Sequence, residues 1–328
     1  MILVKTPLRV TFGGGGTDIF DYSDFYEGYC IGATLNKYCY ITLNENYYDN
    51  FTILKYAITE KVLNKKEIKH PIFNKVLNSI KYKHGVEIST FMDVPSSSGL
   101  GSSSSFSVGL FNVITSINKI KVSKRKLAEK SVYLERFLLR EKGGIQDQYL
   151  CSYGGLNEIT INKNRNVKIK KINISNKNIN RLENCLSLFY LGLRRSSNKI
   201  QSNTFSKKLS KKKITTLSKI KDLAVMSKIA IQNGNMQEFG ECLNENWTLK
   251  KSLNKEIISS SRLNEIYKIA LKSGAVGGKI VGAGGGGFYL FCSLNYNHKK
   301  NLISKLNKMG LKNLEFKFEF EGTQKFVL

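Results

Sequence analysis

A loop rich in serine and glycine in the first third of the chain constrains the fold most strongly. Residues 93–107 read Asp-Val-Pro-Ser-Ser-Ser-Gly-Leu-Gly-Ser-Ser-Ser-Ser-Phe-Ser. Alternating apolar residues over 86–91 predict a strand before the loop, and apolar residues at a spacing of about 3.6 over 106–117 predict a helix after it. A glycine loop at a helix N-terminus presents unpaired backbone N–H groups and the positive end of the helix dipole. The stretch therefore predicts a phosphate-binding loop.

Two other interpretations of this loop are weaker. A Walker A loop is excluded because no Lys-Ser or Lys-Thr pair follows the glycines. A flexible serine-rich linker is disfavoured, since linkers do not run straight into a strongly periodic helix. The hydroxyls of residues 102–105 add short hydrogen-bond donors, and one of them could also ligate Mg²⁺.

Two further glycine segments lie near the ends of the chain. Residues 13–16 are four glycines, followed by Thr17 and Asp18, so the backbone could close on a ligand with a carboxylate at its rim. A hairpin turn that merely uses glycine is the alternative. Residues 279–288 formally contain Gly-x-Gly-x-x-Gly, but a strand rather than a helix follows, which excludes a Rossmann dinucleotide site. We expect a glycine turn there that approaches a ligand or the first half of the chain.

Two downstream carboxylates are candidates for chemistry. Ser123 is predicted to cap a helix running to about Arg140, and Glu135 would lie at the edge of its apolar face. A carboxylate there needs a partner, and a bound cation would serve; an ordinary surface glutamate is the alternative. Asp147 is predicted on a glycine-bounded turn, a natural place for a catalytic acid or base. An Asx turn or a helix cap is the alternative there.

The remaining pattern predicts strands and helices in an α+β order. The predicted strands are residues 1–4, 8–12, 31–43, 51–56, 156–161, 167–169, 186–191 and 314–320, and the predicted helices are 71–82, 213–233, 236–251, 256–273 and 297–308. The Asn/Lys-rich segment 173–184 predicts a boundary near residue 180, which gives domains 1–180 and 181–328. After it, Arg194 and Arg195 could contact a phosphate bidentately or form a solvated surface pair.

Charge and composition narrow the partners. The chain of 328 residues carries a formal net charge of +27, which by itself favours an anionic partner such as nucleic acid or lipid. The charge is spread along the chain, however, and no nucleic-acid recognition module is visible. We interpret the charge as mild support for anionic small substrates.

Cysteine usage and hydropathy favour the cytoplasm. The six cysteines lie far apart without a Cys-x-x-Cys motif, which favours buried free thiols over a zinc site. No apolar run approaches the roughly 18 residues that span a bilayer. The first residues do not have the layout of a signal peptide.

The three glycine segments, 7–18, 95–104 and 279–287, occur in an order that resembles the signature motifs of the GHMP kinase superfamily. That superfamily includes galactokinase, homoserine kinase and mevalonate kinase. The resemblance covers nearly the whole chain. It implies a two-domain α+β fold, with a ribosomal-protein-like N-terminal domain and a ferredoxin-like C-terminal domain.

Within the superfamily, three stretches look most like D-glycero-D-manno-heptose 7-phosphate kinases. They are Gly-Gly-Gly-Thr-Asp at 14–18, Gly-Gly-x-Gln-Asp-Gln-Tyr at 143–149 and Gly-Ala-Gly-Gly-Gly-Gly-Phe at 282–288. The Gly-x-x-Arg-x-Ser pattern that contains Arg195 and ends at Ser197 resembles that branch and the related fucokinases.

The resemblance also implies roles for individual residues. Asp147 matches the catalytic aspartate that takes the proton from a sugar hydroxyl, and Arg9 matches a basic residue that keeps it ionised and stabilises developing negative charge. Ser103 and Glu135 match the Mg²⁺ ligands. The residues matched to ATP binding are Pro95, Ser96, Ser98, Gly99, Leu100, Gly101, Ser102, Ser103 and Ser104. Those matched to substrate binding are Gly15, Gly16, Thr17, Asp18, Asp147, Arg195, Gly284 and Gly285.

The resemblance therefore implies an ATP- and Mg²⁺-dependent phosphotransferase acting on O1 of heptose 7-phosphate, for GDP-heptose and surface polysaccharide synthesis. Galactokinases carry Gly-Glu-His-Thr-Asp where this chain has residues 14–18, which disfavours galactose. A kinase for L-fucose or another hexose is the first alternative, and a catalytically silent, basic RNA-binding protein on the same fold is the second. We expect ATP and a sugar phosphate as partners, with no nucleic acid or membrane, in a monomer or homodimer.

Overall fold

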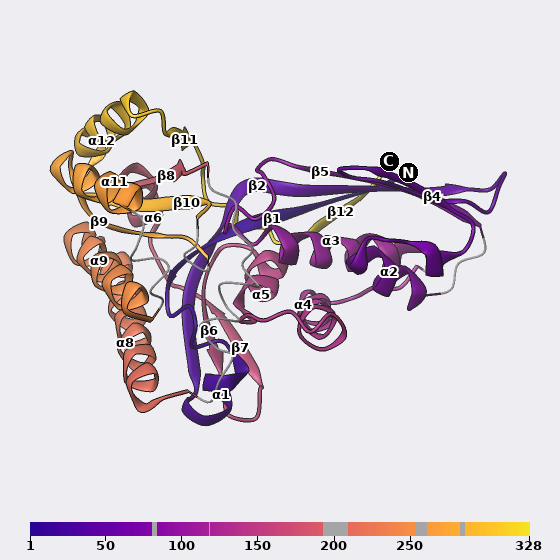
Figure 1. Cartoon of the computed structure of the whole chain (residues 1–328), viewed down its shortest axis with the longest axis horizontal. Helices are drawn as coiled ribbons and strands as arrows, with labels where there is room; N and C mark the ends of the chain where they lie inside the picture. The colour runs from indigo at the N-terminus through magenta and orange to yellow at the C-terminus, as the bar shows by residue number, and fades with distance from the viewer. Residues whose placement is uncertain (81–83, 118, 193–208, 254–260, 283–285) are drawn as a thin grey trace.

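The computed structural model describes residues 1–80, 84–117, 119–192, 209–253, 261–282 and 286–328 (Figure 1). In its first half, strands and helices alternate irregularly. The elements there are β1 (Ile2–Gly13), α1 (Phe20–Tyr26), β2 (Gly28–Asn46), β3 (Thr52–Lys55), β4 (Thr59–Val62), η1 (Lys65–Glu67), α2 (Pro71–Asn78), β5 (Gly85–Met92), α3 (Ser102–Ile117), α4 (Lys124–Val132), η2 (Tyr133–Leu138), α5 (Gln146–Tyr153), β6 (Leu156–Ile161) and β7 (Val167–Lys171).

The first sheet is built around the long antiparallel pair of β1 and β2. The first residues of β2 pair with β6, whereas its last eight residues pair with β5, so the sheet divides along β2. Helices α2, α3, α4 and α5 lie on one side of this sheet (Figure 1). The first residues of β1 pair with β12, near the two chain termini. Its last residues reach the middle of the molecule and lie next to the second half of the chain.

Strand β1 passes through Pro7 without a break, so the prediction of two separate strands, 1–4 and 8–12, is wrong. Proline has no backbone N–H to donate and normally interrupts sheet pairing. Here the pairing of β1 with β2 shifts between Pro7 and Leu8, and this irregularity accommodates the proline. The same strand then carries Arg9 into the interior.

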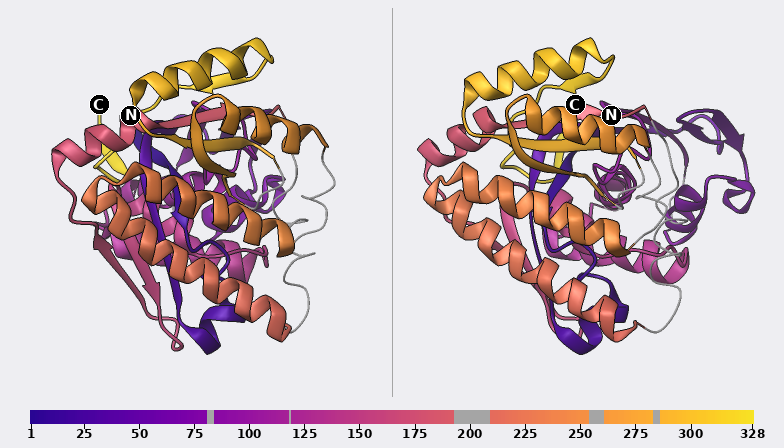
Figure 2. Two further views of the ribbon diagram at one scale, coloured as in Figure 1. Left: turned by 90° about the vertical axis from the view of Figure 1, so that its left-hand side faces the viewer. Right: turned by 60° about the vertical axis from the view of Figure 1, so that its left-hand side comes forward.

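The second half contains a smaller antiparallel sheet in the order β11-β8-β10-β9. Its elements are α6 (Asn176–Cys185), β8 (Leu186–Tyr190), α8 (Lys211–Asn233), α9 (Met236–Leu253), α11 (Ser261–Lys272), β9 (Ala275–Ile280), β10 (Phe288–Ser293), α12 (Tyr296–Lys308), β11 (Lys312–Leu314) and β12 (Gln324–Val327). Helices α8 and α9 lie side by side (Figure 2). Both sheets are antiparallel except for the parallel pair of β3 and β5, and helices pack on their faces, which confirms the predicted α+β class.

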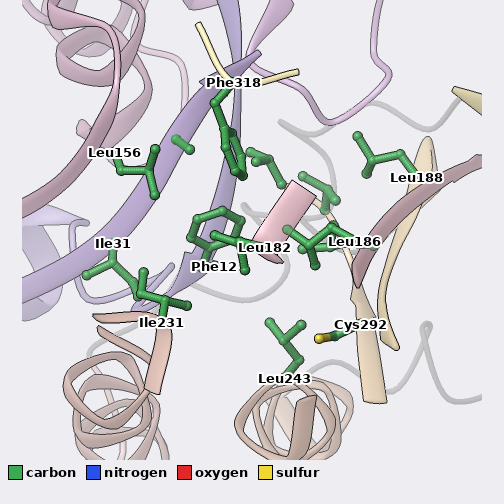
Figure 3. Packing of buried hydrophobic residues seen from close by; sticks show 14 of the residues in the cluster. Phe12, Ile31, Leu156, Leu182, Leu186, Leu188, Ile231, Leu243, Cys292 and Phe318 are labelled. Carbon is green, nitrogen blue, oxygen red and sulfur yellow. The ribbon is translucent and has the colours of Figure 1, made fainter. Parts of the chain in front are cut away.

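The two halves share one hydrophobic core. Phe12 of β1 packs edge-to-face against Phe239 of α9, with ring centroids 5.5 Å apart, and against Phe318 at 6.2 Å. Leu182 of α6 and Leu243 of α9 belong to the same cluster (Figure 3). The end of β1 is therefore held from both sides, and the residues that follow it start from a rigid position.

The C-terminal residues return to the first sheet. Strand β12 pairs antiparallel with β1, and Leu328 N donates to Met1 O, so the two ends of the chain lie together (Figure 1). The segment 173–184, predicted to separate two domains, contains most of α6. The domain boundary near residue 180 stays a prediction.

Three further predicted elements differ from the structure. The helix predicted over 71–82 ends at Asn78. The helix capped by Ser123 begins as expected, but its α-helical part ends at Val132 and continues as the wider π-helix η2. Of the strand predicted over 314–320, only Leu314 lies in a strand, β11, and Phe318 forms an isolated bridge with Leu35. Phe318 N donates to the Glu183 carboxylate instead of to a neighbouring strand.

Two absences apply to the part of the chain that the structure describes. None of its helices is long and apolar enough to cross a membrane. Its six cysteines are all free and buried, as expected, and no cluster of three or more His, Cys, Asp or Glu side chains suited to a metal ion occurs among the described residues.

Candidate active site

The predicted phosphate loop has the conformation that its glycines suggested. Gly99 and Gly101 both have positive φ, and Ser102 begins α3, whose first-turn N–H groups face the loop. A Cβ on Gly101 would lie 3.0 Å from Arg9 Cγ, so the close approach of Arg9 depends on glycine there. The loop is tied to β1 by a hydrogen bond of 3.0 Å from Arg9 N to Leu100 O. Ser98 Oγ is buried and, among the described residues, has no hydrogen-bond partner.

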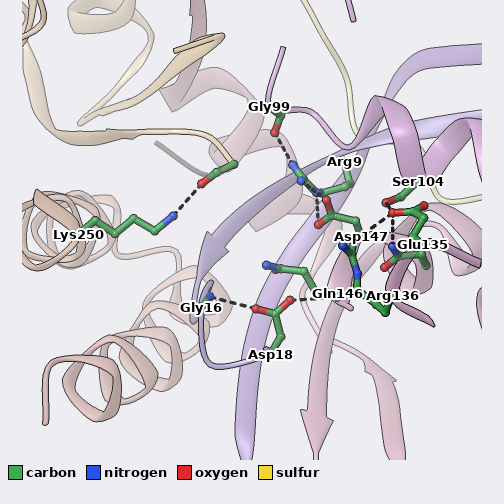
Figure 4. A network of polar contacts seen from close by, with 12 residues as sticks. Arg9, Gly16, Asp18, Gly99, Ser104, Glu135, Arg136, Gln146, Asp147 and Lys250 are labelled. Atoms are coloured by element: carbon green, nitrogen blue, oxygen red, sulfur yellow. Dashed lines mark hydrogen bonds and ion pairs between the residues drawn. The ribbon is translucent and has the colours of Figure 1, made fainter. Parts of the chain in front are cut away.

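Arg9 joins this loop to Asp147 (Figure 4). Its Nε donates to Asp147 Oδ1 at 2.6 Å, Nη2 donates to Asp147 Oδ2, and Nη1 donates to Gly99 O at 2.5 Å. Arg9 is 5% exposed and Asp147 22% exposed, so the carboxylate is the member of the pair that reaches solvent. Burial lowers the pKa of Arg9, but Asp147 more than offsets this and the pKa is raised overall. The guanidinium is thus a fixed cation between the loop and the carboxylate.

Asp147 lies in the first turn of α5, which corrects the prediction of a glycine-bounded turn. Helix α5 begins at Gln146, one residue before Asp147, and ends before Gly154, which has positive φ. The positive end of the α5 dipole also favours a carboxylate at this position.

Asp18 is buried beside Asp147. Its Oδ1 accepts from Gly16 N at 3.0 Å and its Oδ2 accepts from Gln146 N at 3.1 Å (Figure 4). Burial raises the pKa of Asp18, the two backbone hydrogen bonds oppose this, and the nearby charge of Asp147 adds to it. A Cβ on Gly144 would overlap the Asp18 carboxylate, so the close contact between Asp18 and residue 144 also depends on glycine.

The Thr17 side chain holds the glycine loop. Thr17 Oγ1 is fully buried, donates to Gly14 O at 2.8 Å, and accepts from Tyr29 N at 3.0 Å. Its hydroxyl is therefore occupied by backbone groups in this structure. The roles of Thr17 and of Asp18 in reading sugar hydroxyls stay predictions.

Glu135 is buried among hydrogen-bond donors, so the surface-glutamate alternative is wrong. Its Oε1 accepts from Ser107 Oγ at 2.5 Å, and its Oε2 accepts from Ser104 Oγ at 3.2 Å, Gln148 Nε2 at 2.8 Å and Arg136 Nη2 at 3.0 Å. Burial raises the pKa of Glu135 to about 7, although the Arg136 charge opposes the shift. The structure thus brings Ser104 to Glu135, whereas Ser103, the predicted metal ligand, is exposed in the same helical turn.

The donor set around Glu135 suits a hard cation. Carboxylate, hydroxyl and amide oxygens are the ligands that Mg²⁺ accepts, and Mg²⁺ is commonly held by one carboxylate together with substrate phosphates. Gln148 Oε1 is buried next to Glu135 and has no hydrogen-bond partner among the described residues, which leaves an oxygen available. The first turn of α3 and Glu135 therefore bring together oxygen atoms of the kinds that Mg²⁺ accepts.

Residues of the last glycine segment pack directly against the phosphate loop. A Cβ on Gly99 would lie 2.5 Å from Val281 O, and one on Gly282 would lie 2.9 Å from Gly99 Cα. Gly287 meets Ser98 O in the same way. The expectation that the last glycine segment approaches the first half of the chain is thus confirmed at these positions.

Lys250 is a site residue that the sequence did not indicate. It projects from α9, and its Nζ donates to Gly282 O at 2.9 Å (Figure 4). Burial lowers the pKa of Lys250 to about 8, with Asp18 opposing the shift. With 52 lysines and arginines in the chain, no local signal distinguishes this one. Arg195, Gly284 and Gly285 lie outside the described residues.

Comparisons with known proteins agree with this geometry. The family model "GHMP kinases N terminal domain" matches residues 67–155, and "GHMP kinases C terminal" matches residues 227–312. The D-glycero-alpha-D-manno-heptose 7-phosphate kinase of Campylobacter jejuni is 31% identical over 98% of this chain and 98% of its own. The chain belongs to the GHMP kinase family. Family membership makes it a phosphotransferase and confirms the resemblance stated from the three glycine motifs.

More distant relatives agree on the family and the fold. Mevalonate kinase of Methanocaldococcus jannaschii is 28% identical over 68% of this chain and 66% of its own. The crystal structure of a D-glycero-D-manno-heptose 1-phosphate kinase from Bacteroides thetaiotaomicron has a TM-score of 0.81 at 24% identity, covering 100% of this chain and 99% of that one. Lactococcus lactis galactokinase complexed with galactose has a TM-score of 0.71 at 16% identity, covering 100% and 95%. These structures confirm the two-domain GHMP kinase fold.

Proposed function

We propose that this GHMP kinase is an ATP- and Mg²⁺-dependent sugar kinase that phosphorylates the anomeric O1 of D-glycero-D-manno-heptose 7-phosphate. The observation that carries the proposal is the Arg9–Asp147 pair, which joins a carboxylate and a buried cation to the phosphate loop. The Campylobacter jejuni relative, similar over 98% of both chains, supports the choice of acceptor. The 1,7-bisphosphate product would serve GDP-heptose and surface polysaccharide synthesis.

Phosphoryl transfer requires positioning and charge neutralisation more than covalent catalysis by the protein. Asp147 would accept the proton of O1 as that oxygen forms a bond to the γ-phosphorus and the bond to ADP breaks. Each Asp147 oxygen accepts one hydrogen bond from Arg9 and keeps a lone pair for the sugar hydroxyl. Arg9 would prevent rotation of the carboxylate and stabilise the charge that develops on the transferred group.

The neighbouring residues would position the two substrates. The loop from Pro95 to Ser104 would bind the ATP phosphates through backbone N–H groups at the start of α3. Asp18, with Gly15 and Gly16, would orient the sugar. Gln146 Oε1 is buried and, within the described part of the chain, lacks a hydrogen-bond donor, which a sugar hydroxyl would supply.

Glu135 would hold Mg²⁺ together with a serine of the first turn of α3, where Ser103 is the predicted ligand and Ser104 is the nearer side chain. Bound there, the ion would neutralise charge on the ATP phosphates. The protein's own contribution is to fix Glu135 through Ser107, Gln148 and Arg136.

A substrate panel tests the proposal. ADP release would be measured with heptose 7-phosphate, unphosphorylated heptose, L-fucose, D-galactose and mevalonate, and ³¹P NMR would identify the phosphorylated oxygen. We expect turnover with heptose 7-phosphate at O1 and strong dependence on Mg²⁺.

Two results would contradict the proposal. Turnover of a free hexose with none of heptose 7-phosphate would reject the acceptor and favour the alternative sugar kinase. Background transfer with every acceptor, combined with salt-sensitive RNA binding, would reject the kinase reaction itself.

A further inference from the structure

The inward face of α9 carries a lysine, Lys250, near its C-terminal end. Leu243 and Trp247 are buried on this face, and a residue three positions further along a helix lies on the same side. Lys250 is therefore directed into the molecule, and its Nζ reaches the carbonyl of Gly282 at 2.9 Å. Among the described residues, no carboxylate lies within ion-pair distance of Lys250. Lys250 is half-buried, and an ammonium group that is partly withdrawn from water without an anionic partner would gain from a bound anion.

Lys250 lies where the two substrate-binding segments meet. A Cβ on Gly15 would lie 3.7 Å from Lys250 Nζ, which places the lysine beside the predicted sugar-binding loop. Its hydrogen-bond partner Gly282 packs against Gly99 of the phosphate loop. Figure 4 shows Lys250 on the opposite side of the site from Arg9 and Asp147.

A second unsatisfied group marks the same place. A Cβ on Gly15 would lie 3.5 Å from Gln146 Nε2, so Gln146 and Lys250 flank the same glycine. Gln146 Oε1 is buried and has no donor among the described residues. A ligand that offers a hydroxyl to Gln146 and an anionic oxygen to Lys250 would satisfy both.

We propose that Lys250 binds phosphoryl oxygens in the active site, as a second cation facing Arg9 across the reacting groups. The inference rests on the proposed kinase function. The oxygens could come from the γ-phosphoryl group of ATP or from the phosphate of a phosphorylated sugar, because both are dianionic groups that would reach the junction of the two loops. In either case Lys250 is a substrate-binding residue that no glycine motif contains.

The environment of Lys250 gives a pH signature. Burial lowers the pKa of Lys250 to about 8; Asp18, Cys30 and Asp147 oppose the shift, and Arg9 adds to it. Burial lowers the pKa of Lys279 of β9 well below its ordinary value, and the nearby charge of Lys250 adds to this shift. Because only the protonated amine binds a phosphoryl group well, kcat/KM should fall as pH rises above about 8.

Ligand binding to Lys250→Met gives the direct test. Calorimetry would use ADP, the non-hydrolysable ATP analogue AMP-PNP and heptose 7-phosphate, each with Mg²⁺. Removal of one charged contact should weaken binding of the affected ligand about 100-fold. Weaker AMP-PNP binding with unchanged ADP binding identifies the γ-phosphoryl group as the source. Weaker heptose 7-phosphate binding with both nucleotides unchanged identifies the sugar phosphate.

The control variant is Lys219→Met, which removes one exposed positive charge from α8. We expect it to bind all three ligands like the wild type. If Lys250→Met also binds AMP-PNP and heptose 7-phosphate within twofold of the wild type, the inference is wrong. A wild-type protein that does not bind heptose 7-phosphate would defeat the proposed acceptor instead, and the AMP-PNP comparison would still decide the role of Lys250.

A second variant keeps the test decisive if Lys250→Met does not fold. Lys250→Arg retains a cation whose pKa lies far above the assay range. We expect its kcat/KM to stay level above pH 8, where that of the wild type declines. Identical alkaline limbs for the wild type and Lys250→Arg would overturn the proposal, since a purely structural lysine would leave the profile unchanged.

Discussion

Contact between the last glycine segment and the phosphate loop should be essential for ATP use, and Gly287→Ala tests this. Gly287 has φ +85°, and its Cα lies so close to Ser98 O that an added Cβ would overlap that oxygen. Restoring even a tight contact of 3.0 Å requires a shift of about 1 Å in the loop. Ser98 lies immediately before Gly99, whose carbonyl accepts from Arg9. The displacement would therefore reach the Arg9–Asp147 pair.

Two costs of this substitution can be separated. A left-handed backbone conformation costs an alanine about 1–2 kcal/mol of stability. A misplacement of about 1 Å at a catalytic group can reduce turnover on the order of 100-fold. Gly310→Ala is the matched control, because Gly310 has φ +82° and nothing within 4 Å of an added Cβ.

Thermal unfolding and steady-state kinetics with ATP would be measured for both variants. We expect backbone strain to lower the free energy of unfolding of both variants by about 1–2 kcal/mol. Gly287→Ala should lose more than Gly310→Ala, because its added Cβ also overlaps Ser98 O. Only Gly287→Ala should lose kcat/KM for ATP, by about 100-fold. Equal kcat/KM for the two variants and the wild type would refute the reasoning that this contact positions the loop.

Two other predictions concern acidic residues of the candidate site, Asp147 and Glu135. Asp147→Asn should lower kcat by on the order of 100-fold or more while nucleotide affinity, measured by calorimetry, changes little; an unchanged kcat would remove Asp147 from the mechanism. Burial raises the pKa of Glu135 to about 7, so in EDTA the folded protein retains this proton between pH 4.5 and 7 while the unfolded chain releases it. As pH rises across this range, the free energy of unfolding of the wild type should therefore fall relative to that of Glu135→Gln, by at most roughly 3 kcal/mol. The same pH dependence of this free energy in both proteins would contradict the shifted pKa.

The local parts of the site could be predicted because their signals are local. Glycine at positions 99 and 101 permits positive φ, the periodic residues after them specify α3, and together they make a loop at a helix N-terminus. Ser123 could be predicted as a cap because a serine hydroxyl at a helix start accepts a hydrogen bond from a backbone N–H of the first turn, and in the structure it accepts from Lys126 N. These interactions join residues a few positions apart, so a single sequence contains them.

Interactions between distant residues could not be read in the same way. Arg9 and Asp147 are 138 positions apart, and their pairing depends on the packing of α5 against β1. The motif resemblance suggested this pair, whereas composition and spacing alone did not. Strand β1 was also divided at Pro7 in the prediction, because the shifted pairing that accommodates the proline is supplied by β2.

The amino-acid sequence by itself determined the phosphate loop, its helix, the α+β class and the membership of a kinase family. Tertiary structure alone decided that Glu135 is surrounded by four donors, that the last glycine segment packs on Gly99, and that Lys250 faces the site. The physical reason is that backbone freedom and apolar periodicity act within one element. The neighbours of a buried charge are set by which elements pack together, and burial then determines whether that charge needs a ligand.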